Sequence, residues 1–190
     1  ITYQSTGTGA YQSLFSVSNS TNGNQDRHFH IYITPTGTLG FELRNTDSEF
    51  KYTDSRASSV RNTYLGEPAV DTIAFKADSA ERTYKLFANG QLITTLSVDD
   101  YKFISDIYGV DTVSLGGTVR SGSVAYPFAG NIETVQITNE VLSDDELISA
   151  TSDTRYGRLI FNDSDSTISN YFRIPALLTL KSGTIVASAD

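Results

Sequence analysis

One predicted hairpin gathers most of the side chains that could do chemistry. Residues 28–33 and 38–44 each alternate apolar and polar types, and Pro35-Thr36-Gly37 lies between them. A three-residue hairpin loop takes Gly at its last, left-handed position, which here pairs Ile33 with Leu39 and puts the apolar residues on one face. The opposite face then carries the ionisable and aromatic side chains, namely His28, His30, Tyr32, Glu42 and Arg44.

Judged by residue type alone, this polar face has ordinary explanations. A Glu-x-Arg such as Glu42 and Arg44 on an exposed strand is usually a solvated ion pair. His28 and His30 share a face and could ligate a metal, but no third ligand at a suitable spacing accompanies them. We therefore expect no metal site and no cofactor here, and the sequence does not specify a structural calcium site.

A second arginine lies further along the chain, in the segment 118–126, which we expect to be a loop between strands. Arg120 and Tyr126 stand six residues apart in it. On residue type alone, a loop arginine is solvated and a tyrosine before Pro127 covers the edge of the core. Tyr11 begins a predicted strand over 11–17, where ordinary strand packing explains it.

Composition limits the classes of partner. The chain has 190 residues, of which 38% are hydrophobic, enough for one domain with a real core. Its 22 acidic and 14 basic residues give a net charge of −8, which argues against nucleic acid and anionic membrane surfaces. No apolar run is long enough for membrane insertion. The absence of cysteine excludes disulfides and a thiol nucleophile.

The remaining pattern predicts an all-β fold. Short strands are expected at 70–76, 82–88, 91–96, 110–117 and 131–137. Asn89-Gly90 is a strong hairpin signal that would pair Phe87 with Leu92 and Leu86 with Ile93. A capping box from Ser143 to Glu146 predicts one short helix near 144–151. Evenly spaced strands and a single late helix indicate an antiparallel β-sandwich.

The composition changes after this helix. Residues 152–169 are polar and read as a linker, and 170–190 form a second hairpin-like unit too small to bury a core of its own. We therefore expect a domain over 1–151, a linker, and the first strands of a second domain. The first residue, Ile1, is not an initiator Met, which predicts a piece of a longer chain.

Two sets of motifs resemble known families. Leu86–Gly90, Leu115–Gly117, Phe128–Ile132 and Leu142–Leu147 resemble the concanavalin A-like, laminin-G-like jelly rolls. Asp26–Ile33 together with Glu42–Asn45 narrows this to the N-terminal lectin-like domain of bacterial-type sialidases, the family 40 carbohydrate-binding module, over residues 1–151. The stretch Tyr171–Leu178 resembles the Arg-Ile-Pro motif that opens the glycoside hydrolase family 33 propeller.

The resemblance implies a non-catalytic module that recognises terminal sialic acid. Its partners would be sialylated glycans and, in cis, an exo-α-sialidase domain of the hydrolytic or the intramolecular trans-sialidase type, in a secreted or cell-surface protein. Arg173 would be one of three triad arginines in the intact parent. Because the chain ends before the position of the family's acid/base aspartate, we expect this chain alone to be non-catalytic.

Site roles also follow from the resemblance. Arg44 and Arg120 would bind the sugar carboxylate. Glu42 would accept a hydrogen bond from the amide N–H or a hydroxyl of the sugar. Tyr32 would pack along the sugar, and Tyr126 would stack on it or donate a hydrogen bond.

The chain departs from the family in two places. Tyr11 stands where the family has an apolar side chain on the N-acetyl methyl group. Family members also have additional strand residues before the point that matches Ile1, which predicts that part of one sheet is absent.

Two other functions stay open on the residues alone. A jelly-roll glycosidase needs two carboxylates across the scissile bond, but the Glu-x-Asp-x-x-Glu pattern of the laminarinase-like enzymes is missing. Glu42 is also a poor acid, because Arg44 nearby would lower its pKa. A laminin-G-like adhesion module binding protein or another glycan is the alternative, and calcium-dependent protein binding without sialoside binding would favour it.

Overall fold

The computed structural model describes residues 1–6, 9–21, 23, 25–46, 49–56, 70–152, 176–179 and 185–188. Contacts divide the chain into two units, Ile1–Ser152 and Asp153–Asp190. In the second unit, strand β13 (Ala176–Thr179) pairs antiparallel with β14 (Ile185–Ser188). The predicted linker after residue 152 and Arg173 lie outside the described residues, and the domain boundaries stay a prediction.

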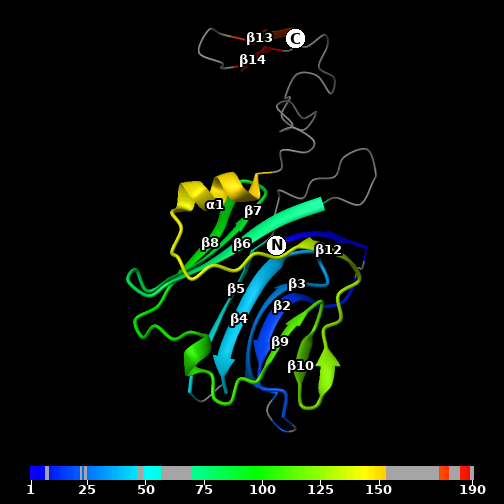
Figure 1. Cartoon of the computed structure of the whole chain (residues 1–190), viewed down its shortest axis with the longest axis vertical. Coiled ribbons are helices and arrows are strands. Elements are labelled where there is room, and N and C mark those ends of the chain that lie inside the picture. The colour runs from blue at the N-terminus through cyan, green and yellow to red at the C-terminus, as the bar shows by residue number, and fades with distance from the viewer. Residues whose placement is uncertain are drawn as a thin grey trace. The chain divides into compact units, whose positions relative to one another are not determined.

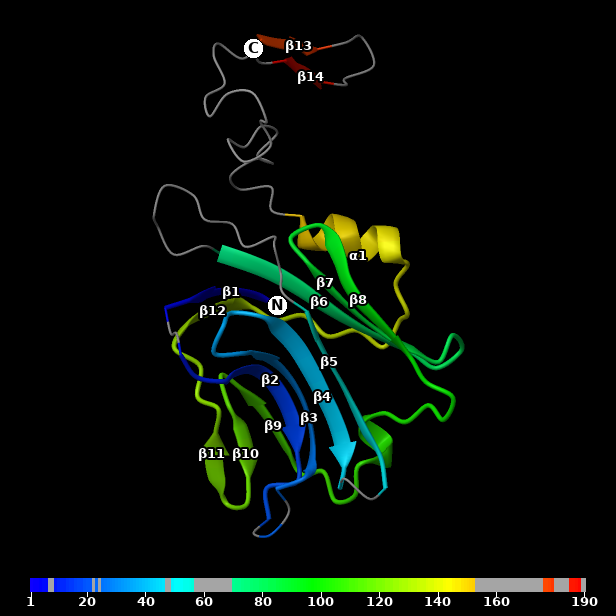
Figure 2. The ribbon, with the colours of Figure 1, turned by 180° about the vertical axis from the view of Figure 1, so that it is seen from behind.

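The first unit is built from two antiparallel sheets of five strands each, within the part of the chain that is described (Figures 1 and 2). One sheet has the order β12 (Gly130–Thr134), β1 (Thr2–Ser5), β6 (Val70–Asp78), β7 (Thr83–Ala88), β8 (Gln91–Ser97). The other has the order β5 (Lys51–Arg56), β4 (Leu39–Asn45), β3 (Arg27–Ile33), β2 (Gln12–Ser18), β9 (Thr112–Leu115). This arrangement confirms the predicted antiparallel β-sandwich.

The β3–β4 hairpin has the predicted register. Ile33 pairs with Leu39, Ile31 with Phe41, and Phe29 with Leu43. The loop closes as expected, because Gly37 adopts a φ of 82°, a conformation that suits a residue without a Cβ. Since side chains alternate along a strand, this register sends one set of residues into the core and the other to the outer face of the sheet.

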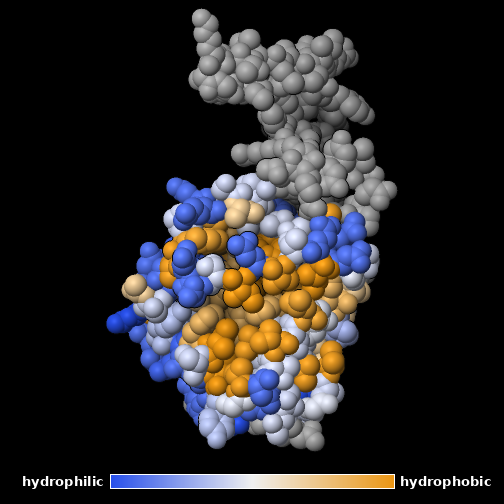
Figure 3. Space-filling view, in the orientation of Figure 1, coloured by the Kyte–Doolittle hydropathy of each residue, from blue (hydrophilic) through white to orange (hydrophobic). Residues whose placement is uncertain are grey.

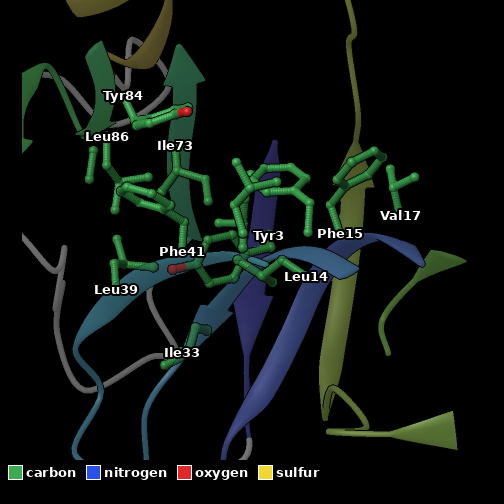
Figure 4. Packing of buried hydrophobic residues seen from close by; sticks show 14 of the residues in the cluster. Tyr3, Leu14, Phe15, Val17, Ile33, Leu39, Phe41, Ile73, Tyr84 and Leu86 are labelled. Carbon is green, nitrogen blue, oxygen red and sulfur yellow. The ribbon is translucent and has the colours of Figure 1, made fainter. Parts of the chain in front are cut away.

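The core lies between the two sheets. Phe41 of β4 packs against Tyr84 of β7, with ring centroids 5.8 Å apart (Figure 4). The ring centroid of Phe75 of β6 lies 5.0 Å from that of Phe41. Partly buried residues such as Tyr52 and Ile93 pack against this cluster. Figure 3 shows apolar side chains over the middle of the face seen in Figure 1, with hydrophilic ones around them. Burial of the aromatic and aliphatic side chains between the two sheets supplies the main driving force for folding.

Helix α1 (Asp144–Thr151) covers the outer face of the β6–β7–β8 sheet. It begins at the predicted capping box, in which the Glu146 N–H donates to Ser143 Oγ and the Ser143 N–H donates to Glu146 Oε2. Its first residue, Asp144, accepts from Lys76 Nζ at 3.1 Å and from Lys85 Nζ at 2.8 Å. The helix is therefore tied to the sheet by charge at its N-terminal end. No helix among the described residues is long and apolar enough to cross a membrane.

Three details of the sequence interpretation were wrong or incomplete. The segment expected as a loop at 118–126 forms a hairpin, β10 (Thr118–Arg120) and β11 (Ser123–Ala125). Leu86 pairs with Thr94 rather than Ile93, because a bulge follows Leu86, although Phe87 does pair with Leu92. Strands β1 and β5 were not predicted at all, since their polar residues hide the alternation that marks a strand.

The junction of β1 and β12 offers a test of the packing. Gly130 has a φ of 146°, and a Cβ there would lie 2.0 Å from the Gln4 carbonyl oxygen. We expect Gly130→Ala to lower the free energy of unfolding by about 3 kcal/mol, the upper end of the cost of overpacking. Urea denaturation followed by circular dichroism measures it.

A control measures the cost of a Cβ at a positive φ where no clash arises. Gly9 also has a positive φ, 82°, but a Cβ there would meet no atom within 4 Å. We expect Gly9→Ala to cost about 1 kcal/mol, the usual penalty of a left-handed residue with a Cβ. Equal losses for the two variants would contradict the proposed clash.

Candidate functional site

The outer face of β3 and β4 carries the side chains that the sequence analysis grouped there. His28 lies opposite Arg44 and His30 opposite Glu42. Tyr32 follows on the same face of β3 by the alternation of the strand. This part of the predicted constellation is present as expected, and it lies on the reverse side of the strands that fill the core.

The β10–β11 hairpin is fastened to the neighbouring strand β2 by serine hydroxyls. Ser16 Oγ donates to the Gly117 carbonyl oxygen at 2.9 Å, and Ser18 Oγ donates to the Val119 carbonyl oxygen at 2.6 Å. Both serines are fully buried. These hydrogen bonds satisfy polar groups that burial would otherwise penalise, and they place Arg120 beside the outer face of β3 and β4.

The turn of this hairpin has its own sequence signal. Ser121 and Gly122 have φ angles of 51° and 74°, the pattern of a two-residue type I′ turn, and Arg120 pairs with Ser123 across it. A Ser-Gly pair between two short segments is a turn signal. That signal could have shown that Arg120 lies in a strand rather than in a loop.

The two arginines converge on one carboxylate. Arg44 forms an ion pair with Asp26 Oδ1, and Arg120 Nη2 lies 4.0 Å from the same oxygen. Their side chains are only 11% and 13% exposed, so each guanidinium is held in place. Asp26 was not among the predicted site residues. The hairpin register could have shown it, since Arg27 pairs with Asn45 and so places Asp26 beside the end of β4.

Tyr126 completes the surroundings of Arg120. Arg120 Nη1 donates to the Tyr126 hydroxyl at 3.1 Å, and the guanidinium carbon lies 5.4 Å from the centre of the ring. Tyr126 has a φ of 54°, the left-handed region that is unusual for a residue with a bulky side chain. Such strained residues often lie at functional sites.

Tyr11 joins Tyr32 and Tyr126 in an aromatic wall. Its ring centroid lies 5.8 Å from that of Tyr32 and 6.2 Å from that of Tyr126. Tyr11 is 49% exposed, whereas Tyr32 is almost buried behind it. All six predicted binding residues in the first unit therefore lie around the same part of the surface.

His30 is a buried, neutral member of this group. Its ring lies 4.8 Å from that of Tyr32 and 5.5 Å from that of Tyr126, and its Nδ1 is 3.3 Å from Thr118 Oγ1. Burial, with the nearby positive charges of His28, Arg120 and Arg44, lowers the pKa of His30 to about 3. His30 is therefore uncharged at neutral pH.

Glu42 stays ionised despite partial burial. Burial alone would raise its pKa, but the hydrogen bond from His28 Nε2 at 2.9 Å and the charge of Arg44 outweigh it and lower the pKa to about 2. Arg44 Nε lies 3.3 Å from Oε1, and Lys51 Nζ lies 4.0 Å from Oε2. A carboxylate held in this state accepts hydrogen bonds but is unsuited to donate a proton as a general acid.

The structure supplies a third partner that the sequence analysis did not find for the histidine pair. Possible ligand atoms of His28, His30 and Glu42 lie within 4.8 Å of one another. Glu42 was missed because it lies on the neighbouring strand, opposite His30. We assign no metal to this group, because His28 and Glu42 already bond to each other and the charges of Arg44 and Arg120 oppose a cation.

An antiparallel β-sandwich that presents paired arginines and a tyrosine wall on the outer face of one sheet has the features of a lectin-like domain. The family model of the sialidase N-terminal domain matches residues 1–155. The chain belongs to this family.

Known relatives match this chain in sequence and structure over most or all of its length. Anhydrosialidase from the leech Macrobdella decora is 57% identical over all of this chain and 25% of its own length. A structure of the leech intramolecular trans-sialidase with 2,7-anhydro-Neu5Ac has a TM-score of 0.79 at 57% identity, covering 100% of this chain and 28% of that one. A structure of the Ruminococcus gnavus IT-sialidase CBM40 bound to alpha2,6 sialyllactose has a TM-score of 0.77 at 59% identity, covering 80% of each. The chain thus spans about a quarter of the curated relatives it matches.

The neutral state of His30 predicts how stability depends on pH. Below pH 6.5, the ordinary pKa of histidine, His30 binds a proton in the unfolded chain. In the folded chain, His30 stays neutral until about pH 3. The free energy of unfolding should therefore fall as the pH drops, by at most about 1.4 kcal/mol per pH unit. In His30→Phe, which keeps a ring against Tyr32 and Tyr126, this part of the slope should vanish.

Urea denaturation between pH 6.5 and 4.5 measures the effect. Above the ordinary pKa of 4.5, Glu42 adds little to the slope, because its carboxyl is largely ionised in both the folded and the unfolded chain. Parallel stability curves for the parent chain and the variant would show that His30 is not buried in its neutral form.

Proposed function

We propose that this chain is a non-catalytic carbohydrate-binding module that recognises terminal sialic acid. The observation that carries the proposal is the convergence of Arg44 and Arg120, from different strands, on a single carboxylate oxygen of Asp26. Sialic acid is a sugar with a planar carboxylate, and arginine holds such a group with paired, charge-assisted hydrogen bonds. Two guanidinium groups fixed side by side suit that ligand.

The remaining site residues take roles that fit their surroundings. Glu42, which stays ionised, would accept a hydrogen bond from the sugar amide N–H or a hydroxyl. Tyr126 would stack on the sugar or donate a hydrogen bond. Tyr11 presents an exposed ring that would pack against the N-acetyl methyl group, and Tyr32 supports it from behind, with its own edge along the sugar.

Relatives support this ligand and a larger parent. The Ruminococcus gnavus module was solved with sialyllactose bound, and the leech relatives are named as sialidases. In the proposal, the module directs an attached exo-α-sialidase, hydrolytic or intramolecular trans-sialidase, to sialylated glycans in a secreted or cell-surface protein. Such a site binds weakly, on the order of millimolar, because few atoms are buried, and it works by raising the local concentration of substrate.

Charge places a condition on the proposal. A chain of net charge −8 repels an anionic glycan at long range. Salt at physiological strength screens that repulsion beyond about 8 Å, so the local charges of Arg44, Arg120 and Lys51 govern the final contact. Binding therefore depends on a positive patch built into an acidic surface.

Titration calorimetry with 3′- and 6′-sialyllactose tests the proposal. We expect Arg44→Ala and Arg120→Ala each to weaken binding by at least about tenfold, the loss of a charge-assisted contact. Lactose, which lacks the carboxylate, should give no binding heat.

Arg82→Ala is the matched control. Arg82 is an exposed arginine in the turn between β6 and β7, and its Nη1 donates to the Asp99 carbonyl oxygen at 3.2 Å. Removing it takes away the same charge from another part of the unit and should leave the affinity unchanged. Equal affinities for all three variants and the parent chain would contradict the assignment of Arg44 and Arg120 to the sugar site.

A further inference from the structure

His28 lies beneath the proposed sugar site with both ring nitrogens in contact with oxygen atoms. Nδ1 lies 3.1 Å from the Gln25 carbonyl oxygen, and Nε2 lies 2.9 Å from Glu42 Oε1. The His28 side chain is fully buried. A histidine in this position cannot exchange its partners for water.

Both of these oxygen atoms are acceptors. A backbone carbonyl accepts hydrogen bonds and donates none, and an ionised carboxylate does the same. A neutral imidazole has one N–H and one bare nitrogen, so one of the two contacts of His28 would set a nitrogen lone pair against an oxygen lone pair. With a proton on each nitrogen, both contacts are hydrogen bonds.

The free-energy cost of burying the resulting charge is offset by the groups in contact with His28. A buried charge is costly unless it is paired and hydrogen-bonded, and His28 has a carboxylate on one side and a carbonyl on the other. Glu42 remains in its charged form, with a pKa lowered to about 2 by the hydrogen bond from His28 and by the charge of Arg44 against the opposing effect of burial. With a proton on both ring nitrogens, His28 would form a charged pair with this carboxylate.

We propose that His28 is a positioning residue of the sugar site, which acts as an imidazolium to hold Glu42 in place and to add a buried positive charge behind the two arginines. The inference rests on the proposed function for its effect on binding. Glu42 Oε1 is shared between His28 Nε2 and Arg44 Nε, at 2.9 and 3.3 Å. Fixing that oxygen therefore also fixes the guanidinium that faces Asp26.

The surrounding groups show what the added charge does. On β4 and β5, Glu42, Arg44 and Lys51 face this cluster, and Asp26 comes directly before β3. Beyond them, neutral His30 packs edge-on with a ring centroid 4.9 Å from that of His28, and β10 contributes Arg120. Among the charged groups, Arg44, Arg120 and Lys51 stand against Glu42 and Asp26. His28 raises this small excess of positive charge, which favours an anionic ligand.

Nitrogen NMR tests the protonation state without any ligand or substitution. The chain contains 2 histidines, so long-range proton–nitrogen spectra of the labelled chain are simple to assign, with His28→Gln removing one set of signals. At neutral pH we expect two protonated ring nitrogens for His28 and one bare nitrogen for His30, which serves as the internal reference. A bare nitrogen in both histidines would overturn the proposal.

Sialyllactose titrations at neutral pH test the consequence for binding. His28→Gln keeps an amide N–H toward Glu42 without the charge, so it should bind about tenfold more weakly than the parent chain, the scale of one charge-assisted contact. Equal affinities for the variant and the parent chain would overturn the proposal.

The two measurements test separate claims, so one can fail without the other. No sialyllactose binding by the parent chain would overturn the proposed function, while the nitrogen spectra would still decide the state of His28. Circular dichroism of His28→Gln checks its fold, and the spectra of the parent chain decide the protonation state if that variant fails to fold.

Discussion

The alternation of side chains along β3 and β4 is the constraint on which core and site both depend. Phe29, Ile31 and Ile33 enter the core, so His28, His30 and Tyr32 must lie on the outer face. A slip of one residue in this pairing would send the charged side chains inward and the aliphatic ones outward. The burial that stabilises the sandwich therefore also fixes the direction in which the site faces.

The site is assembled by adding a second layer to this face. Ser16 and Ser18 of β2 bind the backbone of the β10–β11 hairpin, and the hairpin brings Arg120 to Arg44. Two guanidinium groups in proximity repel each other, and Asp26 between them offsets that repulsion. The structure thus holds a carboxylate at the place where both arginines face, which is the arrangement a ligand carboxylate would use. Such preorganisation reduces the entropy lost on binding.

The sequence could predict what depends on local pattern. The turn at Gly37 and the alternation on either side of it specified the β3–β4 register, and with it the common face of Tyr32, Glu42 and Arg44. The capping box specified helix α1 to the residue. In these cases the deciding interactions join residues close in the chain, so turn chemistry and periodicity suffice.

The rest depends on contacts between distant segments, which no local pattern encodes. Nothing about a serine in a strand shows that its hydroxyl binds a carbonyl group of another segment, so the anchoring of β10 was not predicted. The place of Arg120 in the site followed only from the family resemblance. The third partner of the histidine pair, in contrast, was within reach of the sequence, because the predicted register already placed Glu42 opposite His30. The face opposite the core also carries buried polar groups, with His28, His30, Ser16 and Ser18 all withdrawn from water. Burial of polar groups adds little stability compared with apolar packing. Tyr126, next to these groups, has a left-handed backbone conformation that also costs stability. Together these features are expected where a fold gives up stability to keep a binding surface rigid.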